Sequence, residues 1–230
     1  MKLTRILSNR DGISRKQANA LISAGRVMVN NEICRDPARD TDRFASVTVD
    51  GEIIRPGSSA HYLMLHKPAG YLSATTDDTH TTVMELIPAP LHPGLHLAGR
   101  LDRASTGLLI LSNDGLWSRR LTEPEIRIPK VYRVTTASPI SPDTAERFAE
   151  GIWFEFEQLR TSPAQLECLG PREARLTIYE GRYHQVKRMF HAVGNRVTSL
   201  HRESMGAIHL DPGLAPGAWR ALSAEEIASV

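Results

Sequence analysis

The sequence predicts an α+β fold in two parts: a small N-terminal α/β module and a larger domain with a mainly antiparallel mixed sheet flanked by helices. After residue 61, strand-like apolar patterns outnumber helical ones, as in α+β domains. A stretch rich in Pro, Gly and Ser, residues 55–60, separates this region from the first part of the chain. We therefore expect a module at residues 1–55, a linker at 56–61 and a second domain at 62–230.

The N-terminal module is expected to contain two short helices and a few short strands. Ser14 followed by Gln17 is a capping box that opens a helix, and Gly25 is placed to end it. Alternating apolar residues then form two hairpin patterns, which turn at residues 30–31 and 50–51.

The larger domain contains six segments that predict strands and three that predict helices. One helix is expected from the Ser141–Pro142 start to Gly151, because Pro is favoured at the first helical position. Another is expected within residues 183–194, and a capping box of Ser223 and Glu226 opens a short terminal helix. The predicted strands lie at residues 62–67, 107–112, 130–136, 152–157, 174–180 and 196–203.

Positive charge is concentrated in two separate zones of the chain. Residues 1–35 hold seven Lys or Arg against two acidic residues, a net charge of +5. Residues 172–202 hold the same balance, whereas residues 203–230 carry one Arg against four acidic residues. Two basic zones on a nearly neutral chain indicate a polyanion that is held at two places.

Composition argues against several classes of protein. Cys34 and Cys168 are isolated, and the nine histidines show no HExxH or other zinc spacing. We therefore expect no metal. Isolated thiols and the lack of a signal-peptide pattern predict a reducing, cytoplasmic setting. No apolar run approaches the roughly 20 residues that a membrane span requires.

The segment GRLDRASTGLLILSNDG, residues 99–115, raises the main question about function. Asp102 lies between Leu101 and Arg103, two residues after Arg100 and shortly before a strongly apolar run. The aspartate could be an ordinary turn residue. A buried strand behind it would also hold it rigidly, as a reacting group requires.

Two further segments carry polar groups beside predicted secondary structure. In KVYRV, residues 130–134, strand alternation places Tyr132 on one face with Lys130 and Val134. The segment EGRYHQVKRMF, residues 180–190, leads from a strand end into a basic helix. Taken separately, they would be a core tyrosine and a solvated helix face.

Together these three segments resemble the motifs of pseudouridine synthases of the RsuA group. LHKPAGYLSATTDD (residues 65–78) and HAVGNRVTSLHRESMG (191–206) also fit the group. SRKQANALISAGRVMVNNEI, residues 14–33, resembles an S4 RNA-binding domain. The resemblance covers essentially the whole chain. It implies an enzyme that isomerises a uridine of ribosomal RNA to pseudouridine without a cofactor. Chain length, TTDD, EGRYHQVKRMF and the ending LSAEEIASV favour 16S rRNA as the substrate.

The resemblance also implies a role for each catalytic residue. Asp102 is the nucleophile, and Tyr132 stacks against the target base and assists removal of the proton from carbon 5. Lys187 is expected to be the basic partner of the aspartate, at a position where the group often carries arginine. A lysine cannot form a bidentate pair, so the neighbouring Arg188 is a competing candidate.

Other residues are expected to bind RNA. Arg100 and Arg182 suit phosphate binding or the filling of the gap that a flipped base leaves. The expected partner is ribosomal RNA, either free or in a partly assembled small ribosomal subunit. We expect the protein to bind it as a monomer and not to associate with a membrane. The remaining expected RNA contacts are Gln185, Arg188, Arg5, Arg15, Lys16 and Arg26.

Three alternative functions would require other features of the sequence. A non-catalytic ribosome-assembly protein would lack one of Asp102, Tyr132 or the basic partner, and all three are present. A 23S rRNA enzyme of the same group would differ mainly in terminal extensions. A glycosidase would need a second facing carboxylic acid, and the nearest candidate, Asp114, is better placed to cap the following helix.

Overall fold

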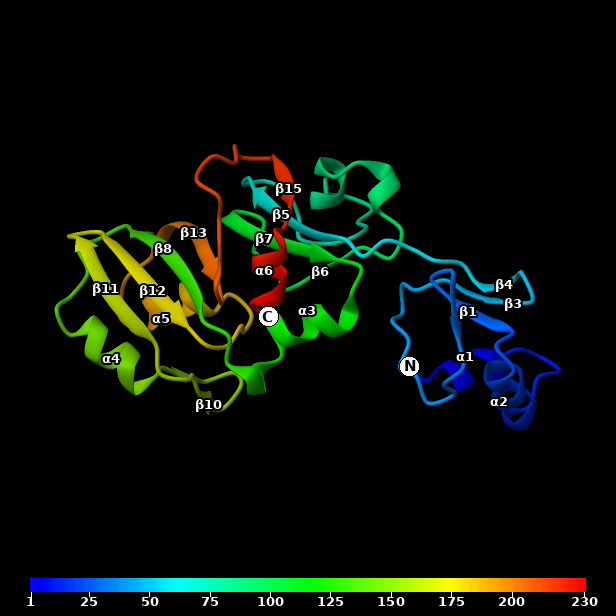
Figure 1. Cartoon of the computed structure of the whole chain (residues 1–230). Helices are drawn as coiled ribbons and strands as arrows, with labels where there is room; N and C mark the ends of the chain where they lie inside the picture. The colour runs from blue at the N-terminus through cyan, green and yellow to red at the C-terminus, as the bar shows by residue number, and fades with distance from the viewer. The chain divides into compact units, whose positions relative to one another are not determined.

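The computed structural model describes all 230 residues, which form two compact units, residues 1–60 and 61–230 (Figure 1). No helix of either unit has the length and apolar character needed to cross a membrane.

The first unit packs two helices on a four-stranded antiparallel sheet of order β2-β1-β3-β4. The predicted capping box of Ser14 and Gln17 is present, and Gly25 follows the helix with a left-handed backbone. Residues 30–31 and 50–51 also have positive φ, so both predicted hairpin turns are confirmed. The elements are α1 (Leu3–Ser8), α2 (Arg15–Ser23), β1 (Val27–Val29), β2 (Glu32–Cys34), β3 (Val47–Val49) and β4 (Glu52–Arg55).

The second unit is built on a nine-stranded mixed sheet, which confirms the predicted α+β class. Its main path runs β11-β12-β8-β13-β7-β5-β15, with β14 paired to β13 and β6 to β7. The strands are β5 (Tyr62–Lys67), β6 (His96–Leu97), β7 (Thr106–Ser112), β8 (Lys130–Thr136), β11 (Gln165–Gly170), β12 (Glu173–Ile178), β13 (Val197–Met205), β14 (Ile208–His209) and β15 (Trp219–Ala221). A separate short pair is formed by β9 (Trp153–Phe154) and β10 (Leu159–Arg160).

One pairing in this sheet differs from all the others because it is parallel. Strand β13 meets β7 over only two registered pairs, His201 with Thr106 and Arg202 with Gly107. Gly107 has a φ of 105°, and a Cβ atom there would lie 2.3 Å from the backbone oxygen of Arg202. Only glycine allows the two backbones to approach this closely.

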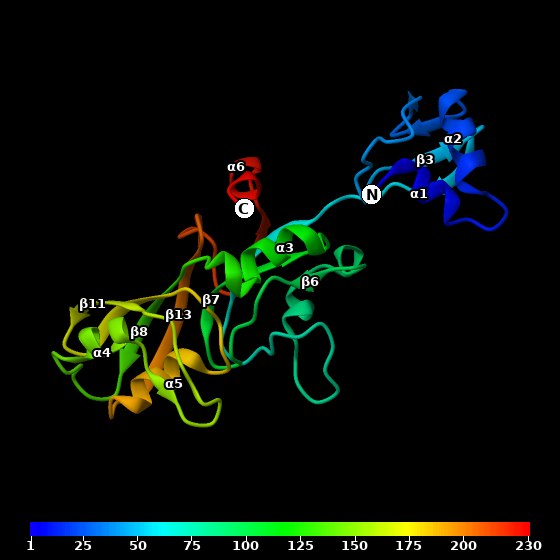
Figure 2. The same ribbon diagram turned by 90° about the horizontal axis from the view of Figure 1, so that it is seen from below.

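Helices cover both halves of the sheet (Figure 2). Phe148 of α4 and Phe190 of α5 pack edge to face, 5.1 Å apart, in a core with residues of β8 and β12. Trp117 of α3 packs on β5 and β7, and its indole N–H donates to the Ile227 carbonyl of α6. The helices are α3 (Gly115–Thr122), α4 (Thr144–Glu150), α5 (Gln185–Ala192) and α6 (Ala224–Ala228), with 3₁₀ turns η1 (Val83–Leu86), η2 (Ala89–Leu91) and η3 (Pro124–Ile126).

Two predicted elements differ from the structure. Residues 152–157 were expected to form one strand, but only Trp153–Phe154 do, and Phe156 is 93% exposed in the turn that follows. The helix expected after Ser141–Pro142 begins later, at Thr144, although it ends at Gly151 as predicted. The helix expected within residues 183–194 is confirmed as Gln185–Ala192.

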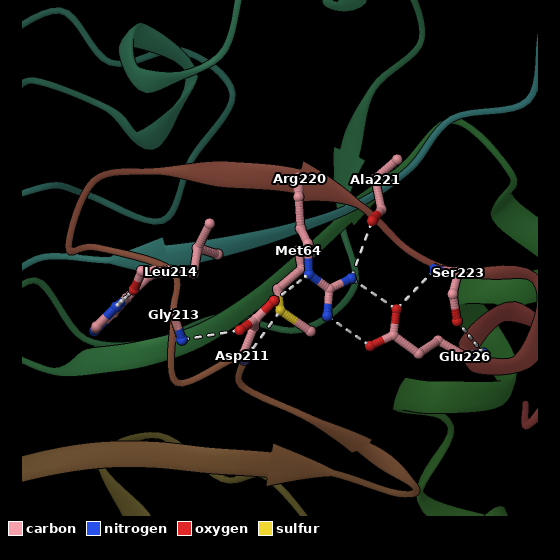
Figure 3. A network of polar contacts seen from close by, with 9 residues as sticks. Met64, Asp211, Gly213, Leu214, Arg220, Ala221, Ser223 and Glu226 are labelled. Carbon is pink, nitrogen blue, oxygen red and sulfur yellow. Dashed lines mark hydrogen bonds and ion pairs between the residues drawn. The ribbon is translucent and has the colours of Figure 1, made fainter.

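The C-terminal helix α6 is attached to the sheet through Arg220 of β15 (Figure 3). The Arg220 guanidinium donates to Asp211 at 2.9 Å and forms two bonds of 2.8 Å to Glu226. The predicted capping box of Ser223 and Glu226 is also present, so one carboxylate serves both the helix start and the ion pair.

Candidate active site

Asp102 lies in the loop between β6 and β7, and this loop is fixed by several hydrogen bonds. The buried Ser73 hydroxyl donates to the Leu101 carbonyl at 2.7 Å and accepts from the Leu101 N–H at 3.2 Å. The Ser105 N–H donates to the Asp102 carbonyl at 3.0 Å. Residues 108–111 of β7 are fully buried, as the apolar run predicted. The aspartate is therefore held by a rigid support.

A fully buried lysine, Lys67, also stabilises this loop through hydrogen bonds to its backbone. The Lys67 ammonium donates to the backbone carbonyls of Pro68, Arg103 and Ser105 at distances of 2.8 to 3.2 Å. Burial lowers the pKa of Lys67 to about 8, against the opposing effect of the Asp102 carboxylate. Two of the three carbonyls belong to residues just after Asp102, so Lys67 restrains its position.

The Asp102 carboxylate has two basic neighbours. The Lys187 ammonium lies 2.6 Å from Oδ2, and His184 Nε2 lies 3.4 Å from Oδ1. Lys187 is in the first turn of α5, and His184 immediately precedes that helix with a left-handed backbone, φ 48°. Of the two competing cations, the structure places Lys187 on the aspartate.

Arg188, the competing cation, is directed elsewhere. Its guanidinium pairs with both carboxylate oxygens of Glu157, and its Cζ lies 3.8 Å from the centroid of the Phe154 ring. It also donates to the Tyr183 carbonyl at 3.3 Å. These contacts connect α5 to the turn between β9 and β10.

Tyr132 is buried on the face of β8 that the alternation predicted, with only 7% of its surface exposed. Arg202 lies opposite it on β13, and a guanidinium N–H donates to the tyrosine hydroxyl at 3.5 Å. Arg202 is also buried and donates to the Leu108 carbonyl at 2.8 Å. On the same face, burial lowers the pKa of Lys130 to about 8, and the charge of Arg202 lowers it further.

A cavity of about 570 Å³ is lined by Asp102, His184, Lys130, Tyr132 and Arg202. Both the Asp102 loop and the Tyr132 face of the sheet line it. Its volume lies within the usual range for small-molecule sites. Five predicted site residues contribute to the lining: Asp102, Tyr132, Arg100, Arg182 and Gln185.

The predicted RNA-binding residues of the larger unit differ in how free their side chains are. Arg100 is exposed and forms no ion pair. Arg182 pairs with Glu180 at 3.1 Å. Gln185 is 3% exposed, accepts from the Arg182 N–H and donates to Glu180, so its amide supports the loop before α5.

In the first unit, the predicted RNA-binding residues are mostly unpaired. Arg5, Arg15 and Lys16 are exposed and form no ion pair. Arg26 is bonded to the Asp50 carboxylate. Three of these four cations are therefore available to a polyanion.

Sequence reasoning did not identify several residues around the aspartate. His184 precedes Lys187 by three positions, a spacing that places two side chains on one helical face and was an available signal. Lys67 and Arg202 gave no such signal, because their contacts join residues 36 to 94 positions apart.

Comparison with known proteins shows the family to which the chain belongs. Residues 61–192 match the RNA pseudouridylate synthase family, and residues 2–40 match the S4 domain. The chain belongs to the RNA pseudouridylate synthase family. The enzyme class and the N-terminal S4 domain expected from the motifs are both confirmed.

Relatives in this family match over the full length of the chain. The ribosomal small subunit pseudouridine synthase A of Pseudomonas aeruginosa is 52% identical, and the protein of that name from Escherichia coli K12 is 46% identical. Both alignments span 230 residues and cover 100% of each chain. The crystal structure of a pseudouridylate synthase matches with a TM-score of 0.73 and 38% identity, covering 100% of this chain and 99% of that one. This pseudouridylate synthase is therefore similar to those relatives in both of its units.

Proposed function

We propose that this pseudouridylate synthase isomerises a specific uridine of 16S ribosomal RNA, with Asp102 as the nucleophile. The contact between the Lys187 ammonium and the Asp102 carboxylate at 2.6 Å, at a cavity that contains Tyr132, is the main support. The choice of RNA is supported by the 52% and 46% identical relatives, which are ribosomal small subunit pseudouridine synthases.

The reaction rearranges one nucleoside and adds or removes no atom. The bond between N1 of uracil and C1′ of ribose breaks, the base turns, and a bond forms between C5 and C1′. C5 loses a proton and N1 gains one. A carboxylate can carry the intermediate by adding covalently to the substrate. The Lys187 ammonium supplies a charged hydrogen bond to the oxygen that does not attack.

Tyr132 is proposed to stack against the uracil and to assist removal of the C5 proton. Its ring lies in the cavity, and the Arg202 guanidinium donates to its hydroxyl. This contact orients the phenol oxygen.

The target uridine must leave its RNA stack to reach Asp102, at a cost of a few kcal/mol, roughly. Arg100, at the cavity and without an ion pair, is proposed to hold a phosphate of the displaced strand. Arg5, Arg15 and Lys16 of the S4 domain are proposed to bind phosphates of the same RNA.

Gln185 and Arg188 are proposed to act mainly by supporting α5. The protein is proposed to act as a monomer in the cytoplasm.

Mapping of the product tests this proposal. The protein is incubated with 16S and 23S transcripts of Pseudomonas aeruginosa and with a partly assembled small subunit. Pseudouridine is then located by chemical modification and primer extension. We expect one modified position in 16S rRNA. Modification confined to 23S rRNA would refute the proposed substrate, and absence of product from all three would refute the proposed reaction.

A further inference from the structure

Tyr183 is an aromatic side chain that lines the active-site cavity yet is 73% exposed. Its ring stacks on the His184 ring at a centroid distance of 3.9 Å and an interplanar angle of 20°. Since one ring face is covered by His184, most of the exposed area belongs to the other face and the edge. The proposed function gives this surface no role.

The stack is continuous with the catalytic group. His184 Nε2 lies 3.4 Å from Asp102 Oδ1, so the imidazole contacts the aspartate at its edge and Tyr183 on its face. Tyr132, the cavity's other tyrosine, is 7% exposed and therefore lies inside it. Tyr183 is consequently placed at the cavity mouth, beside the route that a base must take.

The backbone that carries the stack is held in a defined position. His184 has a φ of 48°, a conformation that costs free energy in a residue other than glycine. The Tyr183 carbonyl accepts from Arg188 at 3.3 Å. The Arg182 N–H donates to the buried Gln185 side chain, and the Gln185 N–H donates to the Arg182 carbonyl. The exposed ring is thus pre-positioned, which lowers the entropic cost of binding on it.

The chemistry around Tyr183 indicates its partner. Arg100, Arg103 and Arg182 line the same cavity, so a ligand at its mouth meets positive charge. An aromatic face beside arginines fits a nucleotide, whose base stacks while its phosphate is neutralised.

We propose that Tyr183, supported by His184, is a stacking platform for the unpaired base next to the target uridine in the RNA strand. When the uridine flips out, its neighbour loses a stacking partner, and the Tyr183 ring replaces it. This inference rests on the proposed function, since it assumes a flipped uridine in the cavity.

Substitutions of Tyr183 test the platform, with Phe156 as a matched control. Phe156 is also an exposed aromatic of this unit, 93% accessible, but it does not line the cavity. Loss of one base–aromatic stack weakens binding by roughly 5- to 140-fold. We expect Tyr183→Ala to weaken binding of the 16S transcript by that factor. Tyr183→Phe keeps the ring and should retain most of the affinity, whereas Phe156→Ala should bind as the wild type does.

A fluorescent base separates failure of the platform from failure of the proposed function. Synthetic RNA hairpins carry 2-aminopurine beside a loop uridine, and stacking on a protein ring changes its fluorescence. We expect the change with the wild type and Tyr183→Phe, and its loss with Tyr183→Ala. An unchanged response of Tyr183→Ala, or equal losses in Tyr183→Ala and Phe156→Ala, would overturn the platform. The fluorescence change requires no turnover. It therefore tests the platform even if product mapping shows that 16S rRNA is not the substrate.

Discussion

Lys187 Nζ lies 2.6 Å from Asp102 Oδ2, while the next residue, Arg188, is paired with Glu157 and lies over the Phe154 ring. Two adjacent cations on one helix thus have different tasks. One faces the proposed nucleophile, and the other connects the helix to a surface turn.

Replacement of each cation by methionine separates these tasks. Lys187→Met removes the charged donor to Asp102, so turnover should fall by roughly 10²-fold with little change in RNA affinity. Arg188→Met leaves Glu157 without its partner. It should lower the melting temperature and leave turnover little changed. Single-turnover kinetics, filter binding and thermal unfolding measure these effects. The reverse pattern would show that Arg188 is the functional partner.

Asp102→Asn is the most direct test of the nucleophile. The amide preserves size and hydrogen-bonding shape but lacks the negative charge, so pseudouridine formation should be lost while folding and RNA binding persist. Asp102→Glu displaces the carboxylate by about an ångström, which costs activity of the order of 10²-fold. Asparagine suits turns as well as aspartate does. A folded Asp102→Asn protein with near wild-type turnover would therefore show that Asp102 is only a turn residue.

The S4 domain is expected to contribute affinity and no chemistry. Deletion of residues 1–55 should weaken RNA binding and reduce the slope of log K against log salt by about two to three, for three lost phosphate contacts. The remainder has its own core and should fold. A full-length variant that carries Arg5→Gln, Arg15→Gln and Lys16→Gln should reproduce most of the change in slope. Arg26→Gln should change the slope less, because the Arg26 guanidinium is already bonded to Asp50. An unchanged slope in the deleted protein would contradict this role.

Arg220 is expected to make stability depend on pH. Its hydrogen bonds lower the pKa of Glu226, and the Gly213 N–H together with Arg220 lowers the pKa of Asp211. A lowered carboxyl pKa stabilises the folded protein above the unfolded values of about 4, and this contribution is lost as pH falls below them. Arg220→Met should therefore lower the melting temperature by a few degrees at pH 7 and by much less near pH ~2.5. Arg119→Met, which removes only an exposed pair with Glu123, is the control and should change little. An equal loss at both pH values would contradict the assignment.

Local signals in the sequence predicted much of the fold. Asp114 was expected to cap a helix, and its carboxylate accepts from the N–H groups of Leu116 and Trp117 at the start of α3. The capping box of Ser14 and the alternation around Tyr132 were confirmed for the same reason, because each depends on residues within a few positions. The strand predicted at 152–157 was wrong because its alternation continues into a turn where Phe156 faces solvent.

The contacts of the candidate site were less predictable because they depend on distant pairing. Arg202 meets Tyr132 only through the register of β13 on β8, across 70 positions. Glu157 is 31 positions from Arg188, so no local pattern indicated that this cation forms an ion pair. The positive φ of His184, which accompanies its stack with Tyr183, also had no sequence signal, since most residues other than glycine, including most histidines, have negative φ.

The narrow parallel contact between β7 and β13 has a consequence for how this enzyme tolerates change. Asp102 enters the site from the β7 side, whereas Tyr132 and Lys187 come from β8 and α5 on the β13 side. The two sides of the proposed catalytic site are therefore connected within the sheet by two registered residue pairs, one of which is Gly107 with Arg202. A methyl group at Gly107 would clash with the Arg202 backbone, and separation of the two strands would shift Asp102 relative to Tyr132 and Lys187. A substitution at Gly107 is thus expected to inactivate the enzyme without any direct contact with the substrate.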